Sequence, residues 1–425
     1  MMPLKQFFAL ALFCAILTLA VPCLALSGTL DRLDAADELT MTISGLSFKQ
    51  MNGSESGLAV LNAFLAPLSA EVSAGSASAR LAFRSGQKEI SALRLQAAEW
   101  PDEHSLPHEA LRRLFTEALP ALYESCLPTE EAEIPEPEFK NARVRNLPAS
   151  TQRTTLTVTP AQLAAADDVL GVFRACGSQL CASLPGAAET TSWLDGIEAA
   201  SDLTLKRLEN ADGDAVAWQL TGQVSSNGKD RRKLTLYGGI SGMNVYVSIK
   251  LPARSGKNRF ELIIDLKDRN GKKESTLEGS ITCKRVLDGI SYTITDTVKL
   301  KNDLTGGEHL TGSIQRSLTE DSIKTVWTVK PDLKGDGNAL SGSLTVTKKH
   351  AQTQVWQAIA DIALKPGIST ETETAADPVA FSTQLLSYLS ACREALSHDQ
   401  QRLFDHMLRT DAWMNGPVVP VPDRK

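Results

Sequence analysis

The stretch Val245-Tyr246-Val247-Ser248-Ile249-Lys250-Leu251 decides the fold, because its side chains alternate between apolar and polar. Successive side chains of a β-strand point to opposite faces of a sheet, so this alternation predicts a strand with one buried and one wetted face. The same period of two recurs at residues 260–266 and 323–329. Across residues 203–364, the pattern predicts about ten or eleven strands.

Short turn signals separate these alternating runs. Asn227-Gly228, Asn270-Gly271, Asp288-Gly289 and Asp336-Gly337 each join a residue that tolerates positive φ to a glycine. Two-residue hairpin turns require such backbone angles. The gaps between the runs are too short for a crossover helix, so neighbouring strands should pair in an antiparallel, up-and-down order.

A weak internal repeat of the form Leu-x-Gly-x-apolar runs through the same segment. Its glycine falls on the apolar side of each strand, where the missing side chain lets a strand bend. We therefore predict a sheet that curls strongly into a half-barrel, although chance in a chain rich in Ser, Thr and Gly is an alternative. The four copies are centred on Gly222, Gly279, Gly312 and Gly342.

Helical patterns flank the predicted meander, which makes the fold class α+β. Thr159-Pro160-Ala161-Gln162 is typical of a helix start, with a threonine cap and a returning glutamine, and predicts a helix over residues 162–184. A second short helix is expected at 189–199. A pair of C-terminal helices is expected from Asp377-Pro378 onward. The first two helices should cover the curled sheet.

The N-terminal part predicts a small α+β region of its own. Leucines at helical spacing indicate a helix that ends near Pro67, and alternation at 79–83 and 90–95 indicates two strands joined by a turn at 85–88. A further helix from about residue 105 should be kinked by Pro120. Six parts follow: a signal peptide (1–25), this region (26–127), an acidic proline-rich linker (128–141), the helices with the meander (142–365), a second linker (366–377) and the C-terminal helices and tail (378–425).

Residues 1–25 are typical of an export signal. Lys5 precedes an uncharged apolar run over residues 7–21, which is shorter than the roughly 20 residues that a bilayer span needs. Cleavage after Ala25 would give a secreted or extracytoplasmic cell-envelope protein with no remaining transmembrane span. An uncleaved anchor and lipid attachment at Cys23 stay open, although Pro22 stands where lipoprotein signals carry a small residue.

Five cysteines follow the predicted cleavage point, and an odd number leaves at least one unpaired in an exported chain. Cys176 and Cys181 form the one plausible disulfide. On an unbroken helix their thiols would diverge by about 140°, so the bridge needs a helix break at Gly177-Ser178. The others are Cys126, Cys283 and Cys392, of which the last two fall on apolar faces.

The sequence carries no recognisable catalytic motif. A nucleophile elbow, a phosphate-binding glycine loop and a zinc-binding His-Glu-x-x-His pair are all missing. The formal net charge of −6 argues against nucleic acid as a partner. We therefore expect a protein that is not an enzyme and needs no cofactor or metal.

Four aromatic side chains fall within the meander and could line an apolar groove on its concave side: Trp218, Phe260, Tyr292 and Trp327. Such a groove is the usual form of a site for a lipid or another apolar small molecule. Alternatively, the helices at 162–184 and 189–199 could fill the concavity and leave a dry core.

The layout of residues 154–364, with two helices before a long run of strands and Leu-x-Gly-x-apolar repeats, resembles the open half-barrel of bacterial lipoprotein carriers. This resemblance implies a curved, helix-lidded sheet that holds acyl chains. The first hypothesis is thus a non-enzymatic envelope protein that binds a lipid. The alternative is a structural or protein-interaction module at the cell surface, using the outer face or a free edge of the sheet. A hydrolase assembled from distant residues is a third.

Overall fold

The computed structural model describes residues 38–51, 58–59, 62–63, 65–75, 78–96, 113–127, 142–143, 149–150, 152–166, 169–174, 187–241, 244–252, 259–366, 387 and 394. The predicted signal peptide, the linker at 128–141 and the second linker from Gly367 onward lie outside these residues. The predicted C-terminal helices also lie outside them, apart from two helical positions, Ser387 and Glu394.

The chain is mostly β, with one large antiparallel meander sheet of 17 strands and a few short helices. It divides into two compact units. Unit 1 holds residues 1–100, 301–314 and 325–425, and unit 2 holds residues 101–300 and 315–324. Within unit 1 the strand Glu38–Met51 pairs with Thr353–Pro366, the last strand of the meander.

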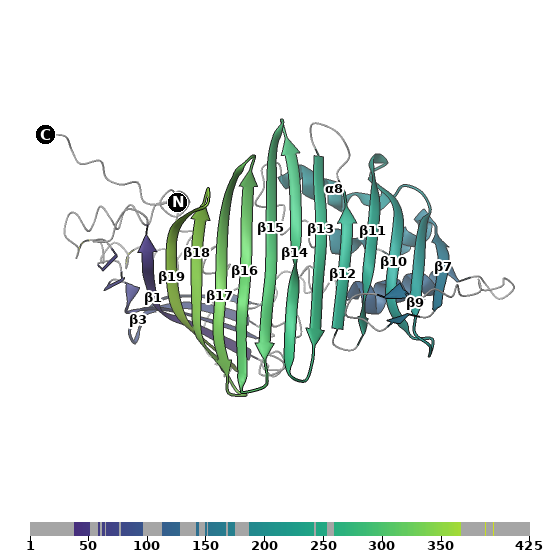
Figure 1. The fold of residues 1–425 in the computed structure, drawn as a ribbon. Coiled ribbons are helices and arrows are strands. Elements are labelled where there is room, and N and C mark those ends of the chain that lie inside the picture. Colours follow the sequence, from purple (N-terminus) through teal and green to yellow (C-terminus); the bar gives the residue numbers. More distant parts are fainter. Residues whose placement is uncertain are drawn as a thin grey trace. The chain divides into compact units, whose positions relative to one another are not determined.

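Unit 2 contains most of the meander, and β9 to β14 lie side by side in chain order (Figure 1). Each of these strands pairs antiparallel with the next, and β9 pairs with β7 on its other side. The strands are β7 (Gln152–Val158), β8 (Ile197–Ala199), β9 (Leu203–Glu209), β10 (Ala215–Ser226), β11 (Lys229–Ser241), β12 (Asn244–Leu251), β13 (Arg259–Asn270) and β14 (Glu274–Leu287). The small pair β5 (Ala142–Arg143) and β6 (Ala149–Ser150) forms a separate ladder.

The register of unit 2 follows the alternation in the sequence. Leu236, Ile249 and Ile264 lie opposite one another on β11, β12 and β13, and all three are fully buried. We call the face that carries them the inner face. The intervening polar residues point to the opposite side, which we call the outer face. The predicted antiparallel meander of about ten or eleven strands is confirmed, with eleven strands in the described part of residues 203–366.

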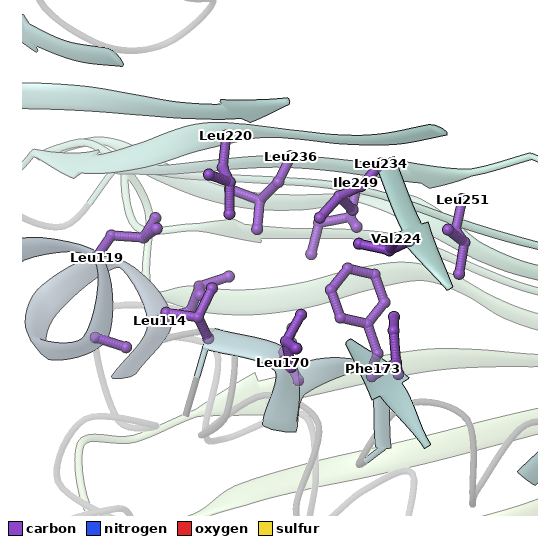
Figure 2. Packing of buried hydrophobic residues seen from close by; sticks show 14 of the residues in the cluster. Leu114, Leu119, Leu170, Phe173, Leu220, Val224, Leu234, Leu236, Ile249 and Leu251 are labelled. Carbon is purple, nitrogen blue, oxygen red and sulfur yellow. The ribbon is translucent and has the colours of Figure 1, made fainter. Parts of the chain in front are cut away.

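Short helices pack on the inner face of unit 2. They are the π-helical turn η3 (Leu114–Ala118), α5 (Leu119–Cys126), α6 (Pro160–Ala165) and α8 (Ala187–Asp195), together with helical residues 169–174. Figure 2 shows Phe173 and Leu170 reaching toward Val224, Ile249 and other sheet residues. Pro120 near the start of α5 cannot donate a helical hydrogen bond, and the π-helical turn directly precedes it. The π-helical turn runs directly into α5 with helical angles at the junction, and the predicted kink stays a prediction.

Two predicted helices are shorter than expected. The capping box at Thr159 and Gln162 is present, but α6 ends at Ala165, and the next residue, Ala166, has φ of −101° and ψ of 59°, outside the helical region. The helix expected over 162–184 is therefore interrupted, and its residues after 174 lie outside the described part. The helix expected over 189–199 ends at Asp195, because Ile197–Ala199 pairs with β10 as strand β8.

Unit 1 joins the two ends of the described chain in one run of paired strands. The antiparallel pairs run from β17 through β18, β19, β1, β2 and β3 to β4. The strands are β1 (Glu38–Met51), β2 (Leu68–Gly75), β3 (Ser78–Ser85), β4 (Lys88–Gln96), β18 (Leu340–His350) and β19 (Thr353–Pro366). The strands β15 (Ile290–Asp303), β16 (Glu308–Glu320) and β17 (Ile323–Gly335) have residues in both units.

The predicted strong curl is not observed, because the sheet is neither closed nor strongly curled. The repeat glycines act locally instead. Gly279, Gly312 and Gly342 have φ of 154°, 132° and 155°, which L side chains rarely adopt, whereas Gly222 has no positive φ. A Cβ on Gly342 would lie 2.1 Å from the carbonyl oxygen of Asp332 on the neighbouring strand. These glycines therefore distort single strands at one residue each.

The hairpin turns follow the sequence in part. Asn227-Gly228 and Asp288-Gly289 have positive φ at both residues, as predicted for two-residue turns. Asn270-Gly271 instead opens a longer loop closed by a hydrogen bond from Gly271 N to Glu274 O. The turn at Ala351-Gln352 also has positive φ at both residues, at 47° and 71°, although neither residue type favours such angles.

Candidate functional site

Two of the four aromatic residues predicted to bind a ligand are buried in the core of unit 2. Trp218 is 5% exposed, and its ring meets that of Tyr123 edge-on at 5.6 Å. Phe260 is 4% exposed and meets Trp193 of α8 edge-on at 5.1 Å. Helical residues thus contact both rings, which belong to one hydrophobic cluster with 30 buried members.

The other two predicted residues are only partly buried. Tyr292 packs against the edge of the same cluster, and partial burial together with the carboxylates of Glu320, Asp321 and Asp288 raises the pKa of its phenol. Trp327 belongs to unit 1. The structure therefore places three of the four residues around one core and the fourth in the other unit.

Trp327 lies in a cross-strand row of unit 1 with Lys348 and Trp356. In the register, Lys348 stands opposite Trp327 on one side and Trp356 on the other. Lys348 is fully buried, and its Nζ lies 5.8 Å from the centroid of the Trp327 ring. Burial lowers the pKa of Lys348 to about 8. Phe48 packs edge-on against Trp356 at 5.8 Å and covers this end of the row.

A buried arginine links β11 to the backbone of β13 near the end of β12. Arg232 on β11 is 5% exposed and donates from Nη1 to the carbonyl oxygen of Phe260 at 2.5 Å. Its guanidinium lies 3.9 Å from the Phe260 ring and 4.7 Å from the Trp193 ring. Burial lowers its pKa, and the hydrogen bond to Asp230 opposes that effect. Arg232 on β11 therefore bonds to the backbone of β13 beyond Leu251, the last residue of β12.

A second buried arginine holds α8 against the sheet. Arg285 on β14 stands opposite Phe260 in the register and is 4% exposed. Its guanidinium donates to the hydroxyl of Thr190 and pairs with Glu189, both in the first turns of α8. The two arginines and α8 therefore form a structural clamp at one end of the inner face.

The outer face of unit 2 carries a second, smaller cluster. Leu208, Val216 and Ala217 are buried there, and Tyr237 and Tyr246 pack against them. The two tyrosine rings meet edge-on, with centroids 6.0 Å apart and planes inclined at 71°. Burial, with a smaller effect of Tyr246, raises the pKa of Tyr237. In contrast to the inner cluster, none of the described residues in this outer cluster is helical.

Polar side chains extend from these tyrosines across the outer face. Tyr237 stands opposite Ser248, Ser248 opposite Asp265, and Asp265 opposite Ser280, on β11 to β14 in turn. One oxygen of Asp265, Oδ1, has no hydrogen-bond partner among the described residues. Tyr246 stands opposite Lys267 in the next row. The outer face of unit 2 thus combines aromatic rings, hydroxyls and a carboxylate.

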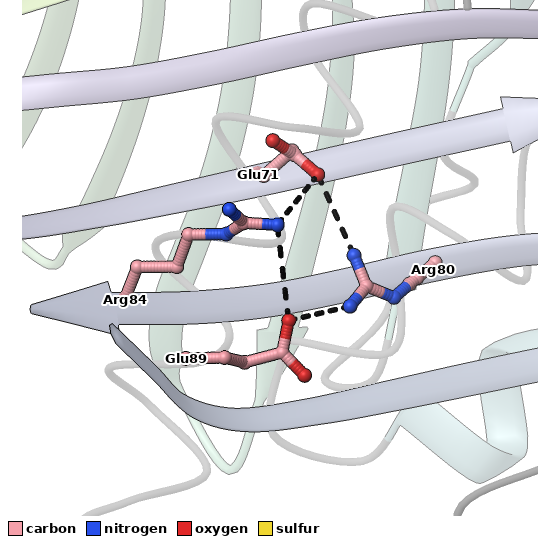
Figure 3. A network of polar contacts seen from close by, with 4 residues as sticks. All are labelled: Glu71, Arg80, Arg84 and Glu89. Atoms are coloured by element: carbon pink, nitrogen blue, oxygen red, sulfur yellow. Dashed lines mark hydrogen bonds and ion pairs between the residues drawn. The ribbon is translucent and has the colours of Figure 1, made fainter. Parts of the chain in front are cut away.

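A charged network fixes the N-terminal hairpins of unit 1 (Figure 3). Arg80 and Arg84 on β3 each approach both Glu71 on β2 and Glu89 on β4, at 2.5 to 3.8 Å. Ala82, between the two arginines in sequence, is fully buried. Because all four charged side chains are at least 22% exposed, the network sets strand register more than it contributes free energy.

Other predicted features fall partly outside the described part of the chain. Cys176 and Cys181 lie outside it, so their proposed disulfide stays a prediction. Neither Cys126 nor Cys283 forms a disulfide within the described residues, and Cys283 is fully buried as the sequence indicated. Within the described residues, no group of three or more His, Cys, Asp or Glu side chains could hold a metal ion. None of the described helices is long and apolar enough to cross a bilayer.

No protein-family model, curated protein or solved structure matches this chain.

The sequence pattern overlooked the outer tyrosines, although it contained a signal for them. Tyr246 occupies a polar position of the decisive strand, between Val245 and Val247. A large aromatic residue on the wetted side of an alternating strand indicates a second packing surface. The sequence did not indicate that Leu208 and Val216 would join the outer cluster. A register shift between Ala215 and Ala217 decides which residues of β10 lie on the outer face, and the sequence pattern does not reveal that shift.

Proposed function

We propose that this chain is a non-enzymatic, extracytoplasmic protein of the cell envelope that uses the outer face of its meander as an interaction surface. One observation carries the proposal: in unit 2 the protein's own helices pack on the inner face, and the outer face holds an aromatic and polar surface. The export signal in residues 1–25 supports the compartment, and the absence of catalytic motifs from the sequence supports a binding role.

The packing of the inner face argues for this role over a carrier role for unit 2. Side chains from η3, α5, α6, residues 169–174 and α8 all enter the inner cluster. Phe173 and Leu163 are fully buried in it. An acyl chain on this face would have to displace these side chains and expose their apolar surface, at a cost of about 25 cal/mol for each Å².

Site-specific photo-crosslinking in cells that naturally make the protein tests this proposal. A photoreactive amino acid would replace Thr235 or Ser248 on the outer face, with Lys272 in the exposed β13–β14 loop as the control position. We expect discrete adducts with an envelope component from Thr235 and Ser248 and fewer from Lys272. Cytoplasmic retention of the protein, or equal adducts from all three positions, would contradict the proposal.

Binding of a lipid or another apolar ligand is the second candidate function. The partial burial of Tyr292 and Trp327 favours it, because these two predicted residues keep ring surface that protein contacts do not cover. Mass spectrometry of an organic extract of the purified protein tests this function. We expect a co-purified lipid that is reduced in Trp327→Ala, and an extract with no ligand would contradict it. The intact mass also reports whether Cys23 carries a lipid.

A further inference from the structure

The rings of the two outer-face tyrosines, Tyr237 and Tyr246, are only partly buried. Tyr237 and Tyr246 lie on adjacent strands, and each covers buried apolar residues while remaining partly exposed. Their edge-on contact holds the rings in fixed orientations, so little side-chain entropy is lost when a ligand packs on them. A ligand suited to this surface has an apolar side that matches an aromatic face.

The same ligand must also offer many hydrogen-bonding groups. Gln219, Tyr237, Ser248, Asp265 and Ser280 stand opposite one another on five consecutive strands, β10 to β14. With strands about 4.8 Å apart, this row extends for about 19 Å. Asp265 Oδ1 is buried and has no partner among the described residues, so it can accept a hydrogen bond from a ligand once its side chain turns outward. A row of hydroxyl, amide and carboxylate groups suits a polyhydroxylated chain.

The charges around this row argue against a strongly charged ligand. Lys206 continues the row on β9, Lys250 and Lys267 flank it on β12 and β13, and Asp265 and Glu278 carry the opposite charge on β13 and β14. A nucleic acid or another polyanion would need a predominantly basic surface. The mixed signs therefore fit a neutral ligand, and sugar rings combine C–H faces that pack on aromatic rings with hydroxyls that form hydrogen bonds.

We propose that the outer face of β10 to β14 binds a neutral polysaccharide, with Tyr237 and Tyr246 packing against sugar rings and Asp265 accepting hydrogen bonds from their hydroxyls. The inference rests on the proposed function and names the chemistry of the partner at the same surface. A cell envelope supplies such chains, so the site would hold the protein at the envelope surface.

Native affinity electrophoresis of the full-length protein tests the inference. The gels would contain dextran, mannan, galactomannan or a soluble β-glucan, and one set would contain an anionic polysaccharide. We expect at least one neutral polysaccharide to retard the protein. Tyr237→Ala and Tyr246→Ala should weaken that retardation about tenfold, which corresponds to about 1.4 kcal/mol.

Matched variants separate a binding role from a packing role. Tyr237→Phe and Tyr246→Phe keep the rings over Leu208 and Val216, so they should retain most of the retardation. Asp265→Asn should weaken it severalfold while leaving the fold intact. Ile323→Ala, at an exposed apolar residue of β17, serves as the control and should behave as the unchanged protein. Circular dichroism and urea unfolding of each variant establish that it is folded.

Three outcomes would overturn the inference: no retardation by any of the neutral polysaccharides, retardation by the anionic polymer alone, or unchanged retardation of the folded Tyr→Ala variants. The crosslinking experiment separates this failure from failure of the proposed function. Adducts between the outer face and an envelope protein, without retardation in the gels, would reject the polysaccharide and keep the interaction surface.

Discussion

The two units of this protein bury positive charge in different ways. Unit 2 places Arg232 and Arg285 at one end of its core, where each pairs with a carboxylate and donates to a further oxygen. Unit 1 places Lys348 within a row of tryptophans, where burial lowers its pKa. The difference shows two settings for a buried cation: Arg232 and Arg285 lie beside carboxylates at one end of the unit 2 core, and Lys348 lies beside the rings of a cross-strand row.

The largest expected effect compares how much a buried phenylalanine contributes to stability in unit 2 and in unit 1. Phe173→Ala removes a fully buried ring that packs between the helices and the sheet, so it should lower the free energy of unfolding by about 3 to 5 kcal/mol. Phe48→Ala in unit 1 is the matched control. Phe48 lies beside register shifts in β1 and belongs to a cluster of five buried residues, so its loss should cost less. Urea unfolding of both variants measures the difference in lost stability. Equal losses in Phe173→Ala and Phe48→Ala would contradict the expected difference between the two cores.

Gly342→Ala tests the repeat glycines of the two units. Its φ of 155° and the approach of Asp332 O leave no room for a Cβ, so we expect a loss of about 3 kcal/mol. Gly222→Ala in unit 2 should cost about 1 to 2 kcal/mol, because its φ is not positive and the obstruction comes mainly from the Leu203 side chain. Thermal or urea unfolding measures the loss of stability in each variant. A larger loss in Gly222→Ala than in Gly342→Ala would contradict the conclusion that the positive φ at Gly342 is the more demanding constraint.

Lys348→Met tests the cost of the buried lysine. The unfolded chain keeps this proton up to about pH 10.5, whereas the folded protein releases it above about pH 8. Between these values the unfolded state binds more protons, so stability should rise with pH across this interval and be lowest below pH 8. Replacement by methionine should stabilise the protein by about 1 to 3 kcal/mol at pH 7.

Unfolding measured at several pH values from 7 to 10.5 checks both parts of this expectation. The rise in stability with pH should be present in the unchanged protein and reduced in Lys348→Met. A variant of the exposed Lys330, changed to Met, should keep the full rise. If Lys348→Met is less stable at pH 7, the lysine contributes more through its contacts with the tryptophans than it loses by burial.

The smallest effect is expected in the charged network of unit 1. Glu89→Gln removes one carboxylate that is 38% exposed, so the loss should stay within about 1 kcal/mol. Added salt should weaken the unchanged protein by a similar amount and have little further effect on the variant. A loss of several kcal/mol would mean that the network supports the hairpins energetically and does more than set their register.

Local patterns predicted much of the meander. Alternation located β12, β13 and β17, and the turns at Asn227 and Asp288 followed from residue types that tolerate positive φ. The turn at Ala351-Gln352 was not predictable, because the pairing of β18 with β19 imposes its angles on residues without that preference. Similarly, the pairing of β8 with β10 overrides the helical pattern after Asp195.

Pairings between distant segments were beyond the reach of the sequence. The strand β1 gave no reliable signal of its own, and its partner β19 lies at the other end of the meander. The strong curl was predicted from glycine positions alone. A glycine allows its own strand to bend, but the curvature of the sheet depends on whether the neighbouring strands bend at the same place. In the candidate site, Tyr246 was visible as an aromatic residue in a polar position, whereas its contact with Tyr237 depends on cross-strand register.

The pairing of β1 with β19 has a consequence for how the chain folds as it is made. Gln50 and Gln354, which share a hydrogen bond, are 304 positions apart. A growing chain therefore completes nearly all of unit 2 before the partner of its first strand has been synthesised. Because ribosomes add about 5 to 20 residues per second, β1 waits roughly 15 to 60 seconds for β19. During that interval its open edge is exposed to mispairing, and a chaperone that shields residues 38–51 would raise the yield of folded protein.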